Sequence, residues 1–481
     1  MAWSGLALLI LVGCGILFTG LPAFVVLVMA ASFGACLGLA TDTFPLALLG
    51  ALPGRLINLF ESDLLQALPL YVTMGLLLDR LPVADALYRA SIAVLPRKPA
   101  APMVSGMLLG ALLGPMNGSV GASVLGLSRV VAPKLAAEGV PAAKREALIA
   151  VASTLGVLVP PSLVLILLSD AMLSAHTFAV TQAGRDDRVI NTQDVFHAAL
   201  VPAGIFLILC LALAWFSGRG VKGLPKREKL TLGQALLAGF SLAALLLLLG
   251  GVATGYFYAV EAAAMGAFAL LTAGIVTGRL RGEVMRGLLR DAMAITGALF
   301  SLLLAATTFT LVLRLLGTDQ LVNNLVAQIP GGDILATAAV LAVIGLCAFV
   351  LDAFEIIFVV LPIVLPPLLV RVADARWVAV LVLLTLQSSF LLPPFGYALM
   401  MVRGALKPAA AFRPFVKALM PFLVAQWLLL IAVLLMPRLV HVLDKDNSRI
   451  SATPLSKDEV DKRFNDMFPL SPPPDALQPG R

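Results

Sequence analysis

The sequence has few charged residues, few aromatic residues and almost no histidine or cysteine. Charged residues make up 13% of its 481 positions and aromatic residues 7%, with three histidines and four cysteines. Soluble domains normally devote ~25% of their residues to Asp, Glu, Lys and Arg, so an ordinary soluble domain is excluded. The cysteines lie singly in apolar stretches without a CxxC pair, at Cys14, Cys36, Cys210 and Cys347. A transition-metal site and a disulfide framework are therefore not expected.

Sequence signatures of enzymes are missing as well. The sequence contains no GK dipeptide of a phosphate-binding loop, no HExxH and no GxSxG. The segment GRGVKG at 218–223 matches the GxGxxG spacing, but it lies in a charged linker with no strand before it, which argues against dinucleotide binding. A membrane-embedded enzyme would need clustered Asp, His or Ser/Lys motifs, and none is seen. We therefore expect neither an enzyme nor an organic cofactor.

The chain is instead rich in long apolar runs. Hydrophobic residues make up 60% of the sequence and the mean hydropathy is +1.00. The segment from Ala2 to Thr41 has no charged residue, which is far longer than the apolar core of ~7–15 residues in a signal peptide. It predicts a pair of membrane spans divided near Gly20-Leu21-Pro22. The composition predicts an all-α, polytopic membrane protein embedded in a lipid bilayer.

Basic residues lie between the apolar runs, so the net charge of +7 indicates membrane topology and not a nucleic-acid partner. The basic linker at 219–230 is expected to be cytoplasmic, and the charge-balanced loop before it is expected to be periplasmic. The resulting division is 1–100 (N-terminal scaffold helices), 101–172 (first hairpin and broken helix), 173–218 (periplasmic loop and span), 219–230 (linker), 231–330 (second-half scaffold helices), 331–403 (second hairpin and broken helix), 404–440 (final span) and 441–481 (disordered tail).

Two apolar segments are broken by double prolines. Pro160-Pro161 and Pro393-Pro394 stand 233 positions apart (393 minus 160), and Pro133 and Pro366 show the same offset. A proline inside a membrane helix frees carbonyl groups that lipid cannot solvate, so such breaks belong at a buried site. We expect two inverted repeats, each with a re-entrant hairpin and a broken helix, whose hairpin tips meet at a transport site. A duplicated channel remains an alternative.

In the first half, a turn of small polar residues from Asn117 to Ser123 interrupts an apolar stretch. Glycines recur every fourth position before it, at Gly106, Gly110, Gly114 and Gly118, which also predicts close helix packing. As a hairpin tip, the turn offers carbonyl and hydroxyl oxygens to a hard cation, or amide groups to a carboxylate.

The matching turn of the second half carries two acids, Asp352 and Glu355. A carboxylate inside a membrane segment costs ~2.5–3.5 kcal/mol on insertion scales, which makes the pair a candidate site. A helix cap, or a salt bridge to Arg314 or Arg371, is the alternative. Polar residues precede the double proline in both halves: Ser153, Thr154 and Gly156 in the first, Gln387, Ser388 and Ser389 in the second.

These residues resemble the large membrane subunit of tripartite ATP-independent periplasmic (TRAP) transporters, within the ion transporter superfamily. The stretches that carry the resemblance are ASTLGVLVPPSLVLILLSD, YAVEAAAMGAF, LDAFEIIFVVLPIVLPP and LQSSFLLPPFGYALMMVRG. The resemblance implies a bacterial inner-membrane transporter with an elevator mechanism driven by sodium. It also implies a small membrane subunit, a periplasmic binding protein and an organic acid as substrate, such as a keto, hydroxy or aromatic acid. A binding-protein-independent anion transporter or channel of the same superfamily is the alternative.

The family's site residues can be carried over by position. One sodium and substrate region would be framed by Asn117, Gly118, Ser119, Ser123, Ser153, Thr154, Gly156, Pro160 and Pro161. The other would be framed by Asp352, Glu355, Gln387, Ser388, Ser389, Pro393, Pro394 and Gly396. The chain departs from the usual pattern at Leu392, where many members have threonine, and at Pro115-Met116. No sequence feature fixes the substrate, because in a tripartite system the binding protein does much of the selecting.

Overall fold

The computed structural model describes residues 2–61, 63–117, 119–185, 188–221, 230–393 and 396–443. Within these ranges the regular elements are all helices. Nine of the described helices are long and apolar enough to cross a membrane, or ten if one bent pair forms a single span. The prediction of an all-α polytopic membrane protein is confirmed. Gly118, Pro394, most of the basic linker and the tail from 444 lie outside the described residues.

The first half contains the helices α1 to α10. Its elements are α1 (Ala2–Thr19), α2 (Ala23–Ala40), η1 (Leu46–Ala51), α3 (Leu52–Glu61), α4 (Asp63–Arg80), α5 (Val83–Val94), α6 (Ala101–Leu113), η2 (Gly114–Met116), α7 (Val120–Ala137), α8 (Ala142–Leu158), α9 (Leu163–Ala183) and α10 (Thr192–Gly218). The chain turns between α1 and α2 at Gly20, whose φ is +65°, and Pro22 precedes the first turn of α2. This is the predicted division of the N-terminal apolar run, since glycine tolerates a positive φ.

The second half contains α11 to α20. Its elements are α11 (Leu232–Ala253), α12 (Ala259–Val276), α13 (Glu283–Leu315), α14 (Thr318–Ala327), α15 (Asp333–Cys347), α16 (Ala353–Glu355), the π-helix η3 (Ile356–Val360), α17 (Leu361–Arg371), α18 (Ala375–Ser389), α19 (Tyr397–Ala405), α20 (Phe412–Leu435) and η4 (Pro437–Leu439).

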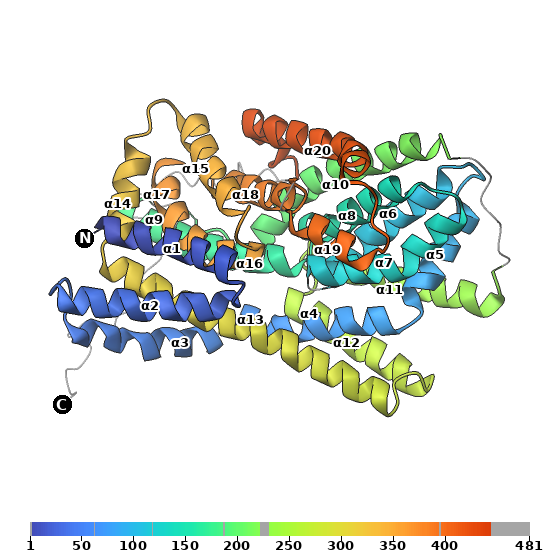
Figure 1. Ribbon diagram of the computed structural model, residues 1–481, viewed down its shortest axis with the longest axis horizontal. Coiled ribbons are helices and arrows are strands. Elements are labelled where there is room, and N and C mark those ends of the chain that lie inside the picture. Colours follow the sequence, from blue (N-terminus) through green and yellow to red (C-terminus); the bar gives the residue numbers. More distant parts are fainter. Residues whose placement is uncertain are drawn as a thin grey trace, which may run out of the picture. The chain divides into compact units, whose positions relative to one another are not determined.

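The two halves repeat the same element order. The helices α7 and α16 begin at Val120 and Ala353, and α8 and α18 begin at Ala142 and Ala375, so each pair differs by 233 positions (353 minus 120, 375 minus 142). Each half has a hairpin (α6–α7, and α15 with α16–α17) followed by a broken helix (α8–α9, α18–α19). Figure 1 shows α6 and α7 of the first hairpin on the right and α15 and α17 of the second on the left, with α16 of the second hairpin between them. The predicted inverted arrangement of two hairpins is confirmed.

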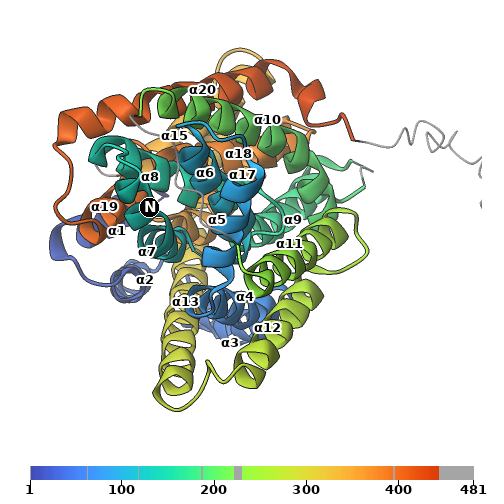
Figure 2. The same cartoon turned by 90° about the vertical axis from the view of Figure 1, so that its right-hand side faces the viewer.

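The hairpins and broken helices of the two halves interleave. Within a half, α6 and α7 pack on α8, and α15 packs on α18. Across the halves, α9 packs on α17, while α19 packs on α7 and α8. Almost all of α8 and α18 is buried, whereas α11 has only four buried residues. Figure 2 shows α11, α12 and α13 on the lower side, away from α8 and α18. The broken helices therefore form the centre of the described fold.

The first hairpin and its broken helix are held in backbone contact by glycines. A Cβ added to Gly110 would lie 2.5 Å from the carbonyl oxygen of Ala152, and one added to Gly156 would lie 2.2 Å from the carbonyl carbon of Gly114. Small residues four positions apart let two helices approach this closely. The glycine pattern thus serves the close helix packing that the sequence predicted.

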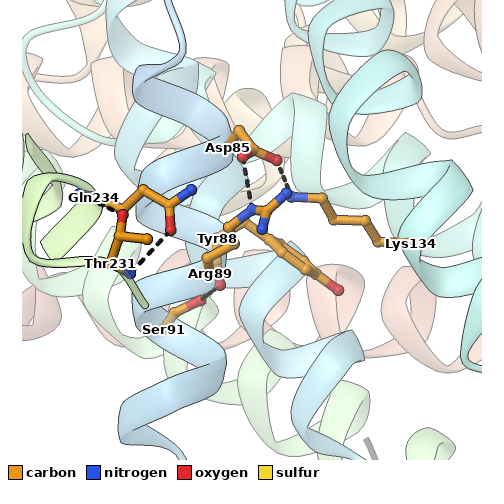
Figure 3. Close-up of polar contacts among 7 residues, drawn as sticks. All are labelled: Asp85, Tyr88, Arg89, Ser91, Lys134, Thr231 and Gln234. Carbon is orange, nitrogen blue, oxygen red and sulfur yellow. Dashed lines mark hydrogen bonds and ion pairs between the residues drawn. The ribbon is translucent and has the colours of Figure 1, made fainter. Parts of the chain in front are cut away.

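Helix α5 is bent by 63° from α4 and is tied to the first hairpin. Asp85, in its first turn, accepts hydrogen bonds from Arg89 at 2.8 Å and from Lys134 of α7. The ammonium of Lys134 also lies 4.7 Å from the centre of the Tyr88 ring, within reach of a cation–π interaction. Figure 3 shows Asp85 between the two basic side chains. This cluster connects a helix of the first hundred residues to the hairpin beyond it.

Candidate functional site

The tips of the two hairpins line one cavity of about 450 Å³. The first hairpin contributes Ser119, and the second contributes Asp352 and Glu355. The remaining lining residues are Pro22, Ala23, Phe24, Val120, Val164, Ile295, Ala298, Leu299, Leu302, Ala353, Phe354, Phe390 and Tyr397. The expectation that the two tips approach each other is confirmed. Helix α13 supplies four of the apolar lining residues.

The first tip is organised by its own small polar side chains. Ser119 is the N-cap of α7, and its Oγ accepts a hydrogen bond from the amide of Ala122 at 3.1 Å. Asn117 donates from Nδ2 to the Oγ of Ser123 at 3.2 Å, while its buried Oδ1 has no hydrogen-bond partner among the described residues. A Cβ added to Gly75 of α4 would lie 2.8 Å from the Cα of Asn117. The tip therefore packs against the backbone of α4.

The second tip begins with Asp352 as the N-cap of α16. The Oε2 of Glu355 accepts a hydrogen bond from the amide of Asp352 at 3.0 Å, so the two acids form a capping box. Arg371 instead donates to the carbonyl oxygens of Val326 and Ile329, at 3.3 and 2.9 Å. The pair therefore caps the helix, which is one of the two alternatives to a site that the sequence allows. Both residues also line the cavity. Each of the two carboxylates can cap the helix and line the cavity at the same time.

A second, small cavity lies between the first tip and the first broken helix. Its volume is about 10 Å³, which is room for roughly one water molecule or one ion. Of the residues expected in this region, Ser119, Ser123, Ser153 and Gly156 line it together. The other lining residues are Gly114, Pro115, Val120, Val157, Ser162, Leu163 and Val164.

Four of the described residues expected in the first half lie outside both linings: Asn117, Thr154, Pro160 and Pro161. Thr154 is buried and donates to the carbonyl of Val151 at 2.8 Å. Pro160 and Pro161 form the break between α8 and α9 without lining either cavity. Ser162, which follows them, was not expected: its Oγ accepts from the amide of Leu165 at 3.1 Å and donates to the carbonyl of Val157 at 2.9 Å. A serine directly before an apolar run is an N-cap signal, and this could have identified it.

The polar residues of the second broken helix, Gln387, Ser388 and Ser389, do not line the large cavity. Ser388 and Ser389 are buried and donate back to the carbonyls of Thr385 and Leu386, at 2.8 and 2.6 Å. Gln387 is fully buried, and neither polar atom of its amide has a hydrogen-bond partner among the described residues. Buried amides are rarely left unpaired, so Gln387 is a candidate ligand for an ion or water.

The break in this helix brings aromatic residues to the cavity. Pro393 lies in the break, and the amide of Gly396 donates to the carbonyl of Leu392 at 2.8 Å. A Cβ added to Gly396 would lie 2.6 Å from the carbonyl oxygen of Phe390. Phe390 and Tyr397, on either side, do line the cavity. Sequence reasoning missed both of them, as well as the four residues of α13, because their roles depend on how distant helices pack.

The described residues contain no group of three or more His, Cys, Asp or Glu side chains that could hold a metal ion. The oxygen atoms at the tips are hydroxyl, amide and carboxylate groups together with main-chain carbonyls. Such hard ligands suit alkali and alkaline-earth cations.

Comparisons with known proteins agree with this architecture. The family model described as "Tripartite ATP-independent periplasmic transporter, DctM component" matches residues 8–439. The 2,3-diketo-L-gulonate TRAP transporter large permease protein of Escherichia coli is 21% identical over 442 residues, covering 90% of this chain and 98% of that protein. The C4-dicarboxylate TRAP transporter large permease protein of Vibrio cholerae is 23% identical over 461 residues, covering 90% and 95%.

Two further similarities support the fold. The sialic acid TRAP transporter permease protein of Haemophilus influenzae is 21% identical over 80% of this chain and 60% of that protein. The crystal structure of the Alcanivorax borkumensis YdaH transporter superposes with a TM-score of 0.63 at 12% identity, over 81% of this chain and 87% of that one. The chain therefore belongs to the DctM family of TRAP transporter large permeases and is a multi-pass protein of the bacterial inner membrane.

Proposed function

We propose that this permease takes up an organic acid, such as a keto, hydroxy or aromatic acid, by sodium-coupled transport. The observation that carries the proposal is the shared cavity: the tips of both hairpins, one from each repeat, line it together with α13. In transporters built from inverted repeats the substrate site lies at the interface of the repeats.

The charges at the cavity support coupling to a cation. Asp352 and Glu355 both line it, and an organic anion is repelled by two carboxylates unless their charge is neutralised. A bound cation supplies that neutralisation. We place one sodium ion in the small cavity beside Ser119, Ser123, Ser153 and Gly156, and a second near Asp352, Glu355 and Gln387. Ser119 lines both cavities, which gives ion and substrate a common side chain through which the binding of one affects the other.

The movement that we propose is of the elevator type. The hairpins and broken helices, at 101–172 and 331–403, would form the moving body, and 1–100 and 231–330 would form the scaffold. The contacts that join these segments in the first half include the backbone approach of Gly75 to Asn117 and the ion pair of Asp85 with Lys134. Both must change when the body slides.

A small membrane subunit and a periplasmic binding protein would complete the transporter. The relatives are permeases of TRAP transporters, and this chain would likewise act as a permease and not as an enzyme. Its scaffold would hold the small subunit, while the binding protein would deliver the acid from the periplasm. A binding-protein-independent anion transporter or channel is the competing function. Uptake measured with and without the binding protein distinguishes the two functions.

The test is uptake of radiolabelled acids into proteoliposomes that contain both membrane subunits and the cognate binding protein. An inward sodium gradient should drive accumulation, and omission of the binding protein should abolish it. Full accumulation driven by a proton gradient in sodium-free buffer would refute sodium coupling. Undiminished uptake without the binding protein would instead favour the independent transporter.

A further inference from the structure

The large cavity is lined by a few polar and many apolar side chains. Its polar groups are gathered at the hairpin tips and the second break, at Ser119, Asp352, Glu355 and Tyr397. The lining residues from α13 and from the turn and start of α2 are all apolar: Ile295, Ala298, Leu299, Leu302, Pro22, Ala23 and Phe24. A ligand that fills this space meets polar side chains only at the hairpin tips and the second break.

Phe24, Phe354, Phe390 and Tyr397 line the cavity. The rings of Phe390 and Tyr397 lie 6.3 Å apart between centroids, at an interplanar angle of 58°, which is the tilted geometry that aromatic pairs favour. A third ring or a branched apolar group inserted beside this pair would gain similar contacts.

We infer that the substrate is an amphipathic monocarboxylate with an aromatic or branched apolar body. Its carboxylate would lie at the hairpin tips, and its body would pack against Leu299 and Leu302 of α13. This inference rests on the proposed function and narrows it to one chemical class. The cavity volume of about 450 Å³ is within the range of ~300–1,000 Å³ typical of small-molecule sites.

Polar acids fit this cavity poorly for a physical reason. The hydroxyl groups of a sugar acid, or the second carboxylate of a dicarboxylic acid, would be buried against the α13 wall without hydrogen-bond partners, and such burial is costly. Three of the relatives are named for 2,3-diketo-L-gulonate, C4-dicarboxylates and sialic acid. The inferred substrate of this chain therefore differs in class from the compounds in those names.

The test is thermal unfolding of the purified complex of the two membrane subunits, in sodium and in potassium buffer, with four probe acids. Phenylpyruvate and 4-methyl-2-oxopentanoate represent the inferred class, and succinate and gluconate represent the polar acids. In sodium buffer we expect the half-saturating concentration of the two apolar acids to be about tenfold or more below that of the two polar acids. One methylene group in an apolar pocket already changes discrimination between ligands by ~10–200-fold.

Matched variants on α13 locate the binding site. Leu302→Gln should raise the half-saturating concentration of phenylpyruvate by about tenfold or more. Leu289→Gln is the control, since Leu289 lies on the same helix, is 55% exposed and does not line the cavity; it should leave the value unchanged. Leu302→Ala serves the same purpose if Leu302→Gln does not assemble.

The possible outcomes separate this inference from the proposed function. Tighter binding of succinate or gluconate than of phenylpyruvate would overturn the inference, and so would equal effects of Leu302→Gln and Leu289→Gln. Stabilisation by sodium with no response to either apolar acid would also overturn it, while sodium coupling would stand. Selective binding of the apolar acids that is the same in potassium buffer would support the inference and refute sodium coupling.

Discussion

Ser119 and Asp352 occupy equivalent positions of the two repeats, 233 residues apart (352 minus 119), and both line the same cavity. Each is the N-cap residue of the helix that leaves its hairpin tip. The repeats therefore place two helix N-termini at one cavity. The N-cap side chain is a hydroxyl in the first half and a carboxylate in the second. This difference makes the two halves of the site chemically distinct within one repeated architecture.

Asp352→Asn should lower sodium-driven uptake about 10- to 100-fold. Hydrogen bonds and ion contacts of a charged group contribute about 1.5–3 kcal/mol, and 1.4 kcal/mol corresponds to a factor of ten. Uptake is measured in proteoliposomes, and retention of the small subunit during purification shows that the variant is assembled. Asp333→Asn, at the exposed start of α15, is the matched control and should transport normally. Wild-type uptake by Asp352→Asn would exclude the carboxylate from the transport site.

Gln387→Met should stabilise the protein in sodium-free buffer and abolish its stabilisation by sodium. The amide of Gln387 is buried without a partner among the described residues, and removing such a group recovers about 1–3 kcal/mol. An ion that binds only the folded protein stabilises it by RT ln(1 + [ion]/Kd), so loss of the sodium effect reports loss of a ligand. The measurement is thermal unfolding over a sodium titration.

Gln426→Met is the control for that titration. Gln426 is also buried, but its Nε2 donates to the carbonyl of Leu384 at 3.1 Å, and it lies on α20, away from both cavities. This variant should keep the full response to sodium. The same response in Gln387→Met would show that the amide does not contact the ion.

Gly156→Ala should destabilise the protein by about 1–3 kcal/mol, which is typical of overpacking a close contact. The added methyl group would meet the backbone of Gly114 at 2.2 Å, and both glycines line the small cavity. The unfolding temperature and the apparent sodium affinity should fall together. Gly204→Ala on α10 has no atom within 4 Å of the new methyl group and should leave both quantities unchanged. Equal behaviour of the two variants would contradict the packing described here.

Cysteines at the two tips should become accessible together. Ser119→Cys and Ala353→Cys, each introduced after replacement of the four native cysteines, place thiols in one shared cavity. A membrane-impermeant reagent should therefore label both from the same side of the membrane, and sodium with substrate should slow both reactions. Labelling of the two positions from opposite sides would mean that the tips open to separate compartments and that the shared cavity is not the transport site.

The local features of the fold could be predicted from the sequence because each depends on nearby residues. The double proline at 160–161 predicted a broken helix because proline lacks an amide hydrogen and cannot continue the ladder of hydrogen bonds. The offset of 233 between equivalent prolines predicted the repeat. The acids at 352 and 355 indicated a candidate site because burying a carboxylate in a membrane costs free energy. These signals require no knowledge of the partners across the fold.

The large cavity depended on tertiary structure. Leu299 and Leu302 are ordinary apolar residues of a long helix, and only the packing of α13 opposite the hairpin tips makes them a wall of the site. Tyr397 enters it because the broken helix ends beside the other repeat's hairpin, where α19 packs on α7. The sequence by itself determined the helices, their breaks and their repeat, since helical hydrogen bonds and the hydropathy of a segment depend on residues that are near one another in the chain. Which side chains face one another across the cavity was decided by long-range packing, because contacts between distant helices leave no periodic signal in either segment.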